Sequence, residues 1–420
     1  MLQRTLTALG TSALLGAALL IAPALTAAAS GTFIASTITG GEEHTCALDT
    51  TGAAWCWGSN DYGQLGNGTY DDSDAAGPQA VAGGLRFISI SAARDNTCGL
   101  TSIGAVYCWG ENNEGQIGNG TSGPDQLTPT AVSGGLKFAS ISVGSQFTCA
   151  LTSAGTAYCW GDPFAGELGN GSLTQKSTPT AVKSSLKFKS INAGYNQACA
   201  LTNEGAAYCW GYNEYGSLGD GTWADRWIPT AVKGGLKFTS IDAGDDFTCA
   251  LTASGAAYCW GDDYSGTLGT GAPGDKNIPK AVIGGQKFIS ISAGDDHSCA
   301  LTATGSAYCW GENDTGELGD GTTDASSNLG PRAVLGGYLF ASVTTNAFSG
   351  DLNHSCGITP EGDAYCWGGN SYGALGDGTT DPSYGNGPQL VLGGHRWMLD
   401  PGGSGCDRSS RGRERCRPTR

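Results

Sequence analysis

Charged and acid–base side chains are scarce in this sequence. Asp, Glu, Lys and Arg make up only 14% of the 420 residues, against about 25% in an average soluble domain. The chain has 22 Lys and Arg against 38 Asp and Glu, with a net charge of -16. This balance disfavours a nucleic-acid binder, because such proteins present a basic surface to the phosphates. With only 4 His, the chain also offers little material for general acid–base catalysis.

Glycine, by contrast, is abundant. The 70 Gly are near twice the usual share of about 7%, which argues against an architecture of long helices. Gly does not recur at every third residue and there are only 15 Pro, so the chain is not collagen-like. Aromatic residues at 9% and hydrophobic residues at 39% exclude a wholly disordered chain. The composition indicates a globular protein rich in turns and strands.

The two ends of the chain differ from the rest. Residues 1–30 combine Arg4, an apolar stretch and small residues near Ser30, which is typical of a signal peptide; a membrane anchor needs a longer apolar run. We therefore expect a secreted, extracellular product without a membrane span. Residues 397–420 include six of the Arg and are expected to be a degenerate or disordered tail, the alternative being a basic segment that docks on an anionic surface.

Cysteines reveal an internal repeat of about fifty residues. They form pairs whose members are ten residues apart, and the first members follow one another at intervals of 50 to 57 residues. Seven copies of the surrounding sequence fill residues 31–396, whereas the pair Cys406 and Cys416 lies in the tail without it. The seven complete pairs are Cys46 with Cys56, Cys98 with Cys108, Cys149 with Cys159, Cys199 with Cys209, Cys249 with Cys259, Cys299 with Cys309, and Cys356 with Cys366.

Each repeat predicts four short strands. In the copy at 238–282 these are F-x-S-I, T-C-A-L, A-Y-C-W and P-x-A-V, which we term strands a, b, c and d. Four strands repeated seven times at a fixed period predict an all-β, seven-bladed β-propeller, which removes long exposed sheet edges by radial closure. A β-solenoid is the alternative, although its rungs are usually shorter and its ends need caps.

The spacing of the cysteines predicts one disulfide in each b–c hairpin. A three-residue loop closed by Asp49 and Ala53 makes Cys46 face Cys56 at a non-hydrogen-bonded position, where Cα atoms approach to about 4.5 Å. Zinc is the rival for paired cysteines, but zinc sites use closer spacing and four convergent ligands. Seven cross-strand disulfides are therefore expected, and export favours their oxidation. No metal and no other cofactor is expected.

The motif from Ala293 to Thr322, A-G-x-x-H-[ST]-C-A-L-T-x-x-G-x-x-Y-C-W-G-x-N-x-x-G-x-L-G-D-G-T, resembles the regulator of chromosome condensation repeat. The resemblance extends from residue 33 to about residue 392 and implies a seven-bladed propeller. The founding member of that family exchanges guanine nucleotide on a nuclear GTPase. This chain departs from it in its export signal, its acidic body and the lack of a clear inserted hairpin. A secreted bacterial β-lactamase inhibitory protein is similar in fold and in export.

Catalytic residues are not indicated. His44, His297 and His354 share one repeat position, two residues before the first Cys, which is typical of a structural role. Turn formation accounts for Asp- and Asn-rich loops without calcium, although they leave Ca²⁺ open as an alternative. Strand order places the a–b and c–d loops at one end of the blades, where 30 of the 38 acids fall, and Lys or Arg residues before strand a at the other. We expect an electrically two-faced propeller.

The c–d loops also carry aromatic residues that do not repeat, including Trp223 and Trp227 around Arg226. Exposed aromatics beside Arg have the composition of an interface hot spot; the alternative is packing between adjacent loops. The expected binding residues are Tyr62, Phe164, Tyr212, Tyr215, Trp223, Arg226, Trp227, Tyr264, Asp245, Asp246, Asp295 and Asp296. These features favour a monomeric, non-enzymatic module that binds a protein. Guanine-nucleotide exchange, secreted enzyme inhibition, or a cell-surface or polysaccharide-binding structural role are the alternatives.

Overall fold

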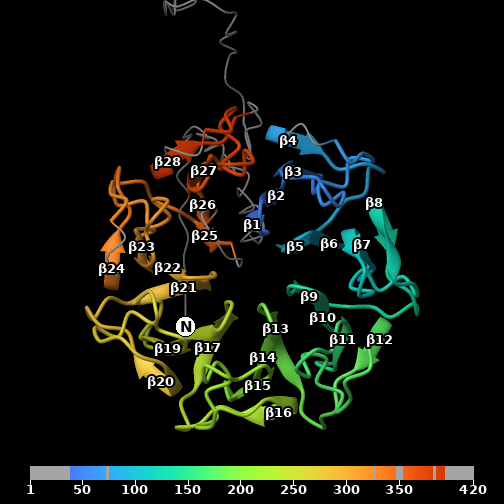
Figure 1. Ribbon diagram of the computed structural model, residues 1–420, viewed down its shortest axis with the longest axis horizontal. Coiled ribbons are helices and arrows are strands. Elements are labelled where there is room, and N and C mark those ends of the chain that lie inside the picture. The colour runs from blue at the N-terminus through green and yellow to red at the C-terminus, as the bar shows by residue number, and fades with distance from the viewer. Residues whose placement is uncertain (1–37, 72–74, 325–327, 347–352, 382–384, 393–420) are drawn as a thin grey trace, which may run out of the picture. The chain divides into compact units, whose positions relative to one another are not determined.

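Seven four-stranded antiparallel sheets stand around a central axis (Figure 1). The computed structural model describes residues 38–71, 75–324, 328–346, 353–381 and 385–392. Within these ranges the chain forms 28 strands, and each sheet is built from four consecutive ones. We call the sheets blade 1 (β1–β4) to blade 7 (β25–β28). The predicted all-β, seven-bladed propeller is confirmed.

Strand a lies nearest the axis and strand d at the rim of each blade (Figure 1). The a strands are β1 (Ile38–Gly40), β5 (Ser89–Ala93), β9 (Ser140–Val143), β13 (Phe188–Ala193), β17 (Phe238–Ala243), β21 (Phe288–Ala293) and β25 (Ser342–Thr345). The b strands are β2 (His44–Leu48), β6 (Asn96–Leu100), β10 (Phe147–Leu151), β14 (Gln197–Thr202), β18 (Phe247–Thr252), β22 (His297–Thr302) and β26 (His354–Ile358).

The two outer strands of each blade complete the sheets. The c strands are β3 (Ala54–Gly58), β7 (Val106–Asn112), β11 (Ala157–Gly161), β15 (Ala207–Gly211), β19 (Ala257–Gly261), β23 (Ala307–Gly311) and β27 (Ala364–Gly368). The d strands are β4 (Ala75–Ala80), β8 (Gly123–Ala131), β12 (Lys176–Ala181), β16 (Arg226–Ala231), β20 (Lys276–Ala281), β24 (Asn328–Ala333) and β28 (Gly385–Leu390). The described residues hold no helix long and apolar enough to cross a membrane.

The b–c hairpin has the predicted register. Asp49 N donates to Ala53 O at 2.9 Å, and Cys46 lies opposite Cys56. All seven complete cysteine pairs form disulfides, with Cα atoms 4.0–4.2 Å apart. The confirmed bridges join Cys46 to Cys56, Cys98 to Cys108, Cys149 to Cys159, Cys199 to Cys209, Cys249 to Cys259, Cys299 to Cys309, and Cys356 to Cys366.

The sulfur atoms are shielded from solvent, because the fourteen bridged cysteines are fully buried. These residues brace the blades, so none of them belongs to a binding surface. The residues of the predicted signal peptide and of the Arg-rich tail with Cys406 and Cys416 lie outside the described residues.

Strand d begins earlier than the sequence pattern indicates. The pattern predicts a start at Pro279 in the fifth repeat, whereas β20 starts at Lys276. The cause is a β-bulge after Cys259, beyond which Gly261 pairs with Lys276. Gly261 has a φ of 115°, and a Cβ there would lie 2.4 Å from the Asp246 carbonyl oxygen, so this bulge requires glycine.

The hydrophobic core lies between neighbouring blades. Phe238 and Trp260 of blade 5 pack against Leu201 and Leu218 of blade 4, and the Phe and Trp recur at five other interfaces. Between blades 7 and 1 the described cluster contains Trp57 and Leu375 but no Phe. The strand-a Phe lies edge-on to the Tyr of strand c, for example Phe238 and Tyr258 with ring centroids 6.3 Å apart. The recurrent Trp after the second Cys is therefore a core residue, as predicted, and each blade depends on its neighbour for burial.

Hydrogen bonds connect each blade to the next. The indole N–H of Trp260 and the hydroxyl of Thr248 both donate to Ser217 O in the preceding blade, at 2.8 and 2.9 Å. The ring closes in the same way, because Trp57 and Thr45 of blade 1 donate to Ala374 O of blade 7 at 2.8 and 3.0 Å. Among the described residues, blades 1 and 7 each consist of four consecutive strands and are joined through these hydrogen bonds.

Candidate functional site: the loop face

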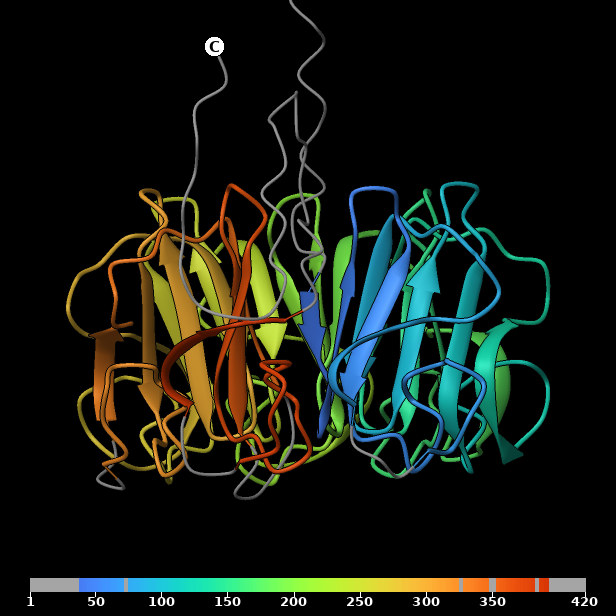
Figure 2. The same ribbon diagram turned by 90° about the horizontal axis from the view of Figure 1, so that it is seen from above.

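The a–b and c–d loops lie at the same end of every blade (Figure 2). The start of each c–d loop bonds to the a–b loop of its own blade, as Asp262 N donates to Asp246 O at 2.9 Å. At the other end, the b–c loop bonds to the d–a connection, as Phe87 N donates to Gly52 O at 2.8 Å. We call the end with the a–b and c–d loops the loop face. Its existence follows the predicted strand order.

Large aromatic side chains are exposed on the loop face. Tyr264 is 88% exposed, Phe164 69% and Trp223 50%, while Tyr62 and Tyr215 are near 40%. Phe164 and Tyr264 occupy the same place in the c–d loops of blades 3 and 5, and Tyr62 and Tyr215 share the next position in blades 1 and 4. Such large side chains left in water provide contact area for a partner.

Trp227 and Arg226 contribute to the structure as well as to the surface. Both lie on β16 rather than in a loop. A Cβ on Gly166 of the preceding blade would lie 2.6 Å from the Trp227 ring, so this ring packs on the neighbouring c–d loop while 46% of it stays exposed. The Arg226 guanidinium pairs with Asp220 at 2.7 Å. Arg226 is therefore held by its own blade, and the alternative of packing between loops applies in part to Trp227.

Tyr212 lies close to Tyr215, with ring centroids 6.3 Å apart, and donates its hydroxyl to Glu214. Burial raises the pKa of Tyr212, and the hydrogen bond to Glu214 adds to this rise. The nearby Asp246 carboxylate raises the pKa of Tyr215. These two rings therefore stay neutral and border a negatively charged region.

That region contains the four predicted acidic residues and two more. Asp295 is buried at 4% exposure, whereas the other five are half-buried. Of the described residues, none of the Lys or Arg side chains forms an ion pair with any of the six. We call the six residues the anionic cluster: Asp245, Asp246, Asp262, Asp295, Asp296 and Glu312.

Burial and mutual repulsion raise the pKa values of the anionic cluster. Burial raises the pKa of Asp295, and Asp296 and Asp245 add to this rise. Burial raises the pKa of Glu312 to about 8, with repulsion from Asp296 adding to it. Burial also raises the pKa of Asp262 to about 6. The cluster therefore holds protons near neutral pH that isolated carboxylates would have lost.

A second acidic group on this face contains its own cation. Arg94 Nε lies 3.8 Å from Glu42 and 3.5 Å from Asp95, and Glu111 is close by. Burial still raises the pKa of Asp95 to about 8, and Arg94 opposes that rise. We call Glu42, Arg94, Asp95 and Glu111 the Arg94 cluster. None of these four is among the binding residues predicted from the sequence, although their repeat positions match those of predicted ones.

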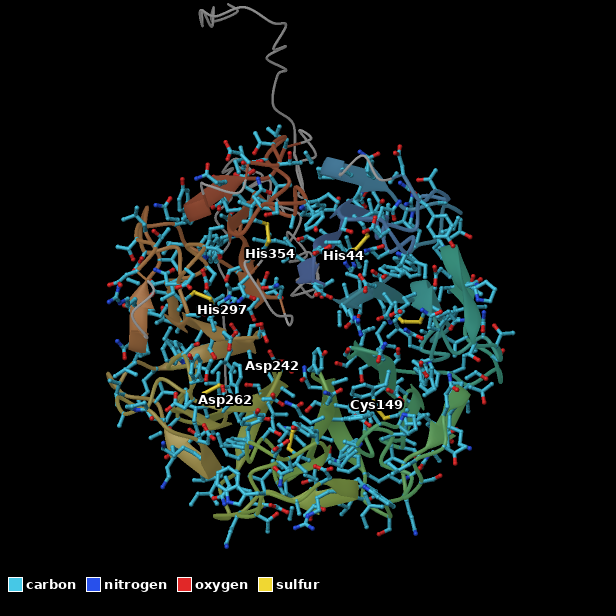
Figure 3. All side chains as sticks on the ribbon, viewed as in Figure 1. His44, Cys149, Asp242, Asp262, His297 and His354 are labelled. Atoms are coloured by element: carbon cyan, nitrogen blue, oxygen red, sulfur yellow. A yellow bond between two sulfur atoms is a disulfide. The ribbon has the colours of Figure 1, made fainter. Side chains whose placement is uncertain are left out.

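The three histidines are buried between blades (Figure 3). His44 Nε2 lies 2.9 Å from Thr97 Oγ1, and Thr97 Oγ1 donates to Gln64 O, so the imidazole N–H donates to this hydroxyl. His354 contacts Thr45 in the same way across the ring closure. Burial lowers the pKa of His44 to about 3. These positions fit the predicted structural role, because each of the three side chains is buried and hydrogen-bonded to a hydroxyl of the next blade.

Metal ligation has no support from the described residues, where no group of three His, Cys, Asp or Glu side chains is placed to hold an ion. The Asp and Asn side chains of the c–d loops bond instead to their own loops. Asn313 Oδ1 accepts from Leu318 N at 3.1 Å, and Asp320 Oδ1 accepts from Thr322 N at 3.0 Å. Turn formation therefore accounts for these side chains.

We expect the stability of the protein to fall as pH rises from about 4 to about 8. Carboxyl groups whose folded pKa is raised contribute stability below their unfolded pKa near 4, and lose it as pH rises through values of about 8 for Asp95, Glu167 and Glu312. His44 and His297 oppose this below pH 6.5, because their folded pKa is about 3. The free energy of unfolding in urea should be roughly a few kcal/mol larger at pH 5.5 than at pH 8.

The matched variant for this measurement is Glu312→Gln, which should reduce the difference between the two pH values. Glu361→Gln, an exposed change on the opposite face, should leave the difference unchanged. Stability that is constant or that increases up to pH 8 would contradict the raised pKa values.

Comparisons with known proteins agree with the fold. The family model described as RCC1-like domain matches residues 7–351, and the regulator of chromosome condensation (RCC1) repeat matches residues 347–374. Yeast RCC1 (Prp20), solved bound to Kap60, is 22% identical with a TM-score of 0.73, over 86% of this chain and 88% of that one. Human WBSCR16 is 18% identical with a TM-score of 0.71, over 81% and 94%.

Two curated relatives match over shorter segments. The protein RCC2 homolog of Danio rerio is 34% identical over 31% of this chain, and the ultraviolet-B receptor UVR8 of Arabidopsis thaliana is 32% identical over 33%. The matched segments span 26% and 32% of those relatives' own lengths. The family model, by contrast, covers most of the chain and coincides with most of the blades. The chain therefore belongs to the RCC1-like domain family, the family of its predicted repeat.

Proposed function

We propose that this protein is a secreted, non-enzymatic binding module that presents its loop face to a cationic protein. The observation that carries the proposal is the exposure of large aromatic side chains beside carboxylates that form no ion pair with a described Lys or Arg. Aromatic anchors with a charged surround are the usual composition of an interface hot spot. The signal-peptide pattern of residues 1–30 supports secretion.

Binding by a rigid surface suits this architecture. The loops of the loop face are fixed by hydrogen bonds within and between blades, so little conformational entropy is lost when a partner docks. The structures similar in fold include Prp20 bound to Kap60, and Prp20 studied for its binding to Gsp1p and histones. Other proteins with this fold therefore bind proteins. Their sequence identity to this chain is low enough that the likeness concerns the fold alone.

Replacing exposed aromatics on the loop face should weaken partner binding without unfolding the blades. We expect Trp223→Ala and Tyr264→Ala each to cost about 1 to 2 kcal/mol, roughly five- to thirtyfold in Kd. Captured extracellular proteins would be compared by quantitative mass spectrometry between wild type and variants, and Kd then measured for the enriched partner. Ile103→Ala, a 71% exposed residue on the opposite face, is the control. Equal loss in the control would contradict the assignment of the loop face.

Guanine-nucleotide exchange is the second candidate, because the founding member of the family has that activity. A nucleotide-release assay with the oxidised protein and a small GTPase tests it directly. Release accelerated by this protein, and abolished by loop-face variants, would favour exchange over a purely binding role. We expect no acceleration.

A further inference from the structure

Blades 1 and 2 carry charged residues at the same five loop-face positions as blades 5 and 6. Counting from the cysteines of each repeat aligns the a–b turns, and the strand register agrees, because Ala93 pairs with Asn96 and Gly294 N donates to His297 O. Arg94 and Asp295 are both the first residue of a two-residue turn. The equivalent pairs are Glu42 and Asp245, Glu43 and Asp246, Arg94 and Asp295, Asp95 and Asp296, and Glu111 and Glu312.

Among these five pairs, the sign of the charge differs at one. Outside them, Asp262 and Tyr264 of blade 5 stand where blade 1 has Ser59 and Asp61. At the pair whose sign differs, blades 1 and 2 have Arg94, whose guanidinium lies between Glu42 and Asp95 and partly neutralises both. Blades 5 and 6 have Asp295, an acid among acids. The Arg94 cluster therefore contains a cation that pairs with its acidic residues. The anionic cluster has an acidic residue at each of the equivalent acidic positions, but among the described residues no cation pairs with it.

The lack of a paired cation is unfavourable for the free protein because of the environment of Asp295. Its side chain is 4% exposed, and its Oδ2 atom accepts no hydrogen bond from any described residue. A buried carboxyl oxygen that accepts no hydrogen bond is unfavourable, because folding removes it from water without replacing the hydrogen bond that water supplied. An incoming cation that reached the adjoining carboxylates of Asp245 and Asp296, both half-buried, would offset part of this unfavourable free energy.

Aromatic rings border the cluster on the side of blades 4 and 5. Tyr264 N lies 3.3 Å from the Asp262 carboxylate and its ring is almost fully exposed. Tyr215 lies near Asp246 and Asp262, which raise the pKa of its hydroxyl. A planar guanidinium can pair with two carboxylate oxygens and stack on a tyrosine face at once, which an ammonium cannot do.

Resting on the proposed function, we propose that the anionic cluster accepts one arginine side chain of a partner protein, which takes the place that Arg94 takes between blades 1 and 2. Asp245, Asp246 and Asp296 provide the carboxylates, and Tyr264 the stacking surface. Since the free cluster retains protons, arginine binding releases protons to solvent as the carboxylates ionise.

The probe is tetra-arginine, a peptide of arginines alone that is acetylated at its N-terminus and amidated at its C-terminus, titrated into the oxidised full-length protein by calorimetry at pH 7. We expect one site, an affinity that falls with added salt, and an observed enthalpy that depends on the buffer because protons are released. The equally blocked tetra-lysine should bind more weakly. Absence of tetra-arginine binding by the wild type, or binding without proton release, would overturn the proposal.

Three variants make the test specific. Asp295→Arg supplies the missing cation from within and should weaken tetra-arginine binding by at least about tenfold. Asp61→Arg changes the net charge equally at an exposed residue of the same face and should stay within about twofold of wild type. Arg94→Asp removes the cation from the Arg94 cluster and should add a second tetra-arginine site, weaker than the first because blade 1 has Asp61 where blade 5 has Tyr264. This variant keeps the test valid even if Asp295→Arg does not fold.

If Asp295→Arg and Asp61→Arg weaken tetra-arginine binding equally, the binding reflects net charge, and the proposal of a specific site is overturned. The outcome is separable from that of the proposed function. Loss of partner capture in Trp223→Ala with no tetra-arginine site would leave the binding module standing and refute only this inference. If tetra-arginine binds the anionic cluster but loop-face variants capture partners as well as wild type, the arginine site stands and the proposed binding function is refuted.

Discussion

Reduction of the seven disulfides is expected to unfold the propeller at room temperature. Each bridge closes a loop between cysteines ten residues apart, which restricts the unfolded chain by about 2 to 3 kcal/mol. Seven such bridges together exceed the roughly 5–15 kcal/mol by which ordinary domains are stable. The protein unfolded in urea with dithiothreitol should therefore stay unfolded when only the urea is removed. Circular dichroism and thiol alkylation followed by mass spectrometry measure both states.

Two controls distinguish the stabilising effect of the disulfides from the slow reduction that burial of their sulfur atoms causes. All fourteen bridged cysteines are fully buried, so dithiothreitol without denaturant should reduce them only slowly. A variant with Cys149→Ala and Cys159→Ala together should lose about 2 to 3 kcal/mol and keep its fold. A fully reduced chain with the urea midpoint of the oxidised protein would contradict the expected contribution.

Trp57→Ala should be the most destabilising single substitution at the ring closure. The side chain is fully buried between blades 1 and 7, and its indole N–H donates to Ala374 O at 2.8 Å. Truncating a buried Trp costs about 3 to 5 kcal/mol, because a large cavity remains. The bond from the indole N–H is lost, but the Ala374 carbonyl still accepts from the Thr45 hydroxyl. The free energy of unfolding in urea measures the loss.

Two further variants test this reasoning. Trp57→Phe keeps most of the volume and should cost about 1 to 3 kcal/mol, mainly for the missing N–H donor. Trp223→Ala removes a half-exposed ring and should change stability by no more than about 0.5 kcal/mol. Equal losses for Trp57→Ala and Trp223→Ala would mean that the closure between blades 1 and 7 does not determine the stability of the ring.

The repeat could be predicted from the sequence because its determinants are local. Cys46 and Cys56 face one another as soon as a three-residue loop closes at Asp49, and no distant residue changes that register. The early start of strand d could not be predicted in this way, because the bulge beside Gly261 depends on how the a–b turn and strand c meet in three dimensions.

The candidate site was only partly predictable. Tyr264 and Phe164 are exposed on the loop face as expected, since they interrupt the repeat in loops of known direction. Arg226 belongs to an ion pair within its own blade, because Asp220 lies close enough only after the c–d loop folds back. The burial of Asp295 likewise depends on the neighbouring blade, which a single repeat does not contain.

The sequence by itself determined the number of blades, the disulfides and the end at which the acids gather, because each follows from spacing along the chain. The tertiary structure decided how those acids differ. Arg94 and Asp295 hold equivalent positions, but only packing between successive blades shows that one completes a partly neutralised group and the other is buried among further carboxylates. Burial and pairing arise from contacts between repeats, and electrostatic free energies depend on those contacts rather than on composition.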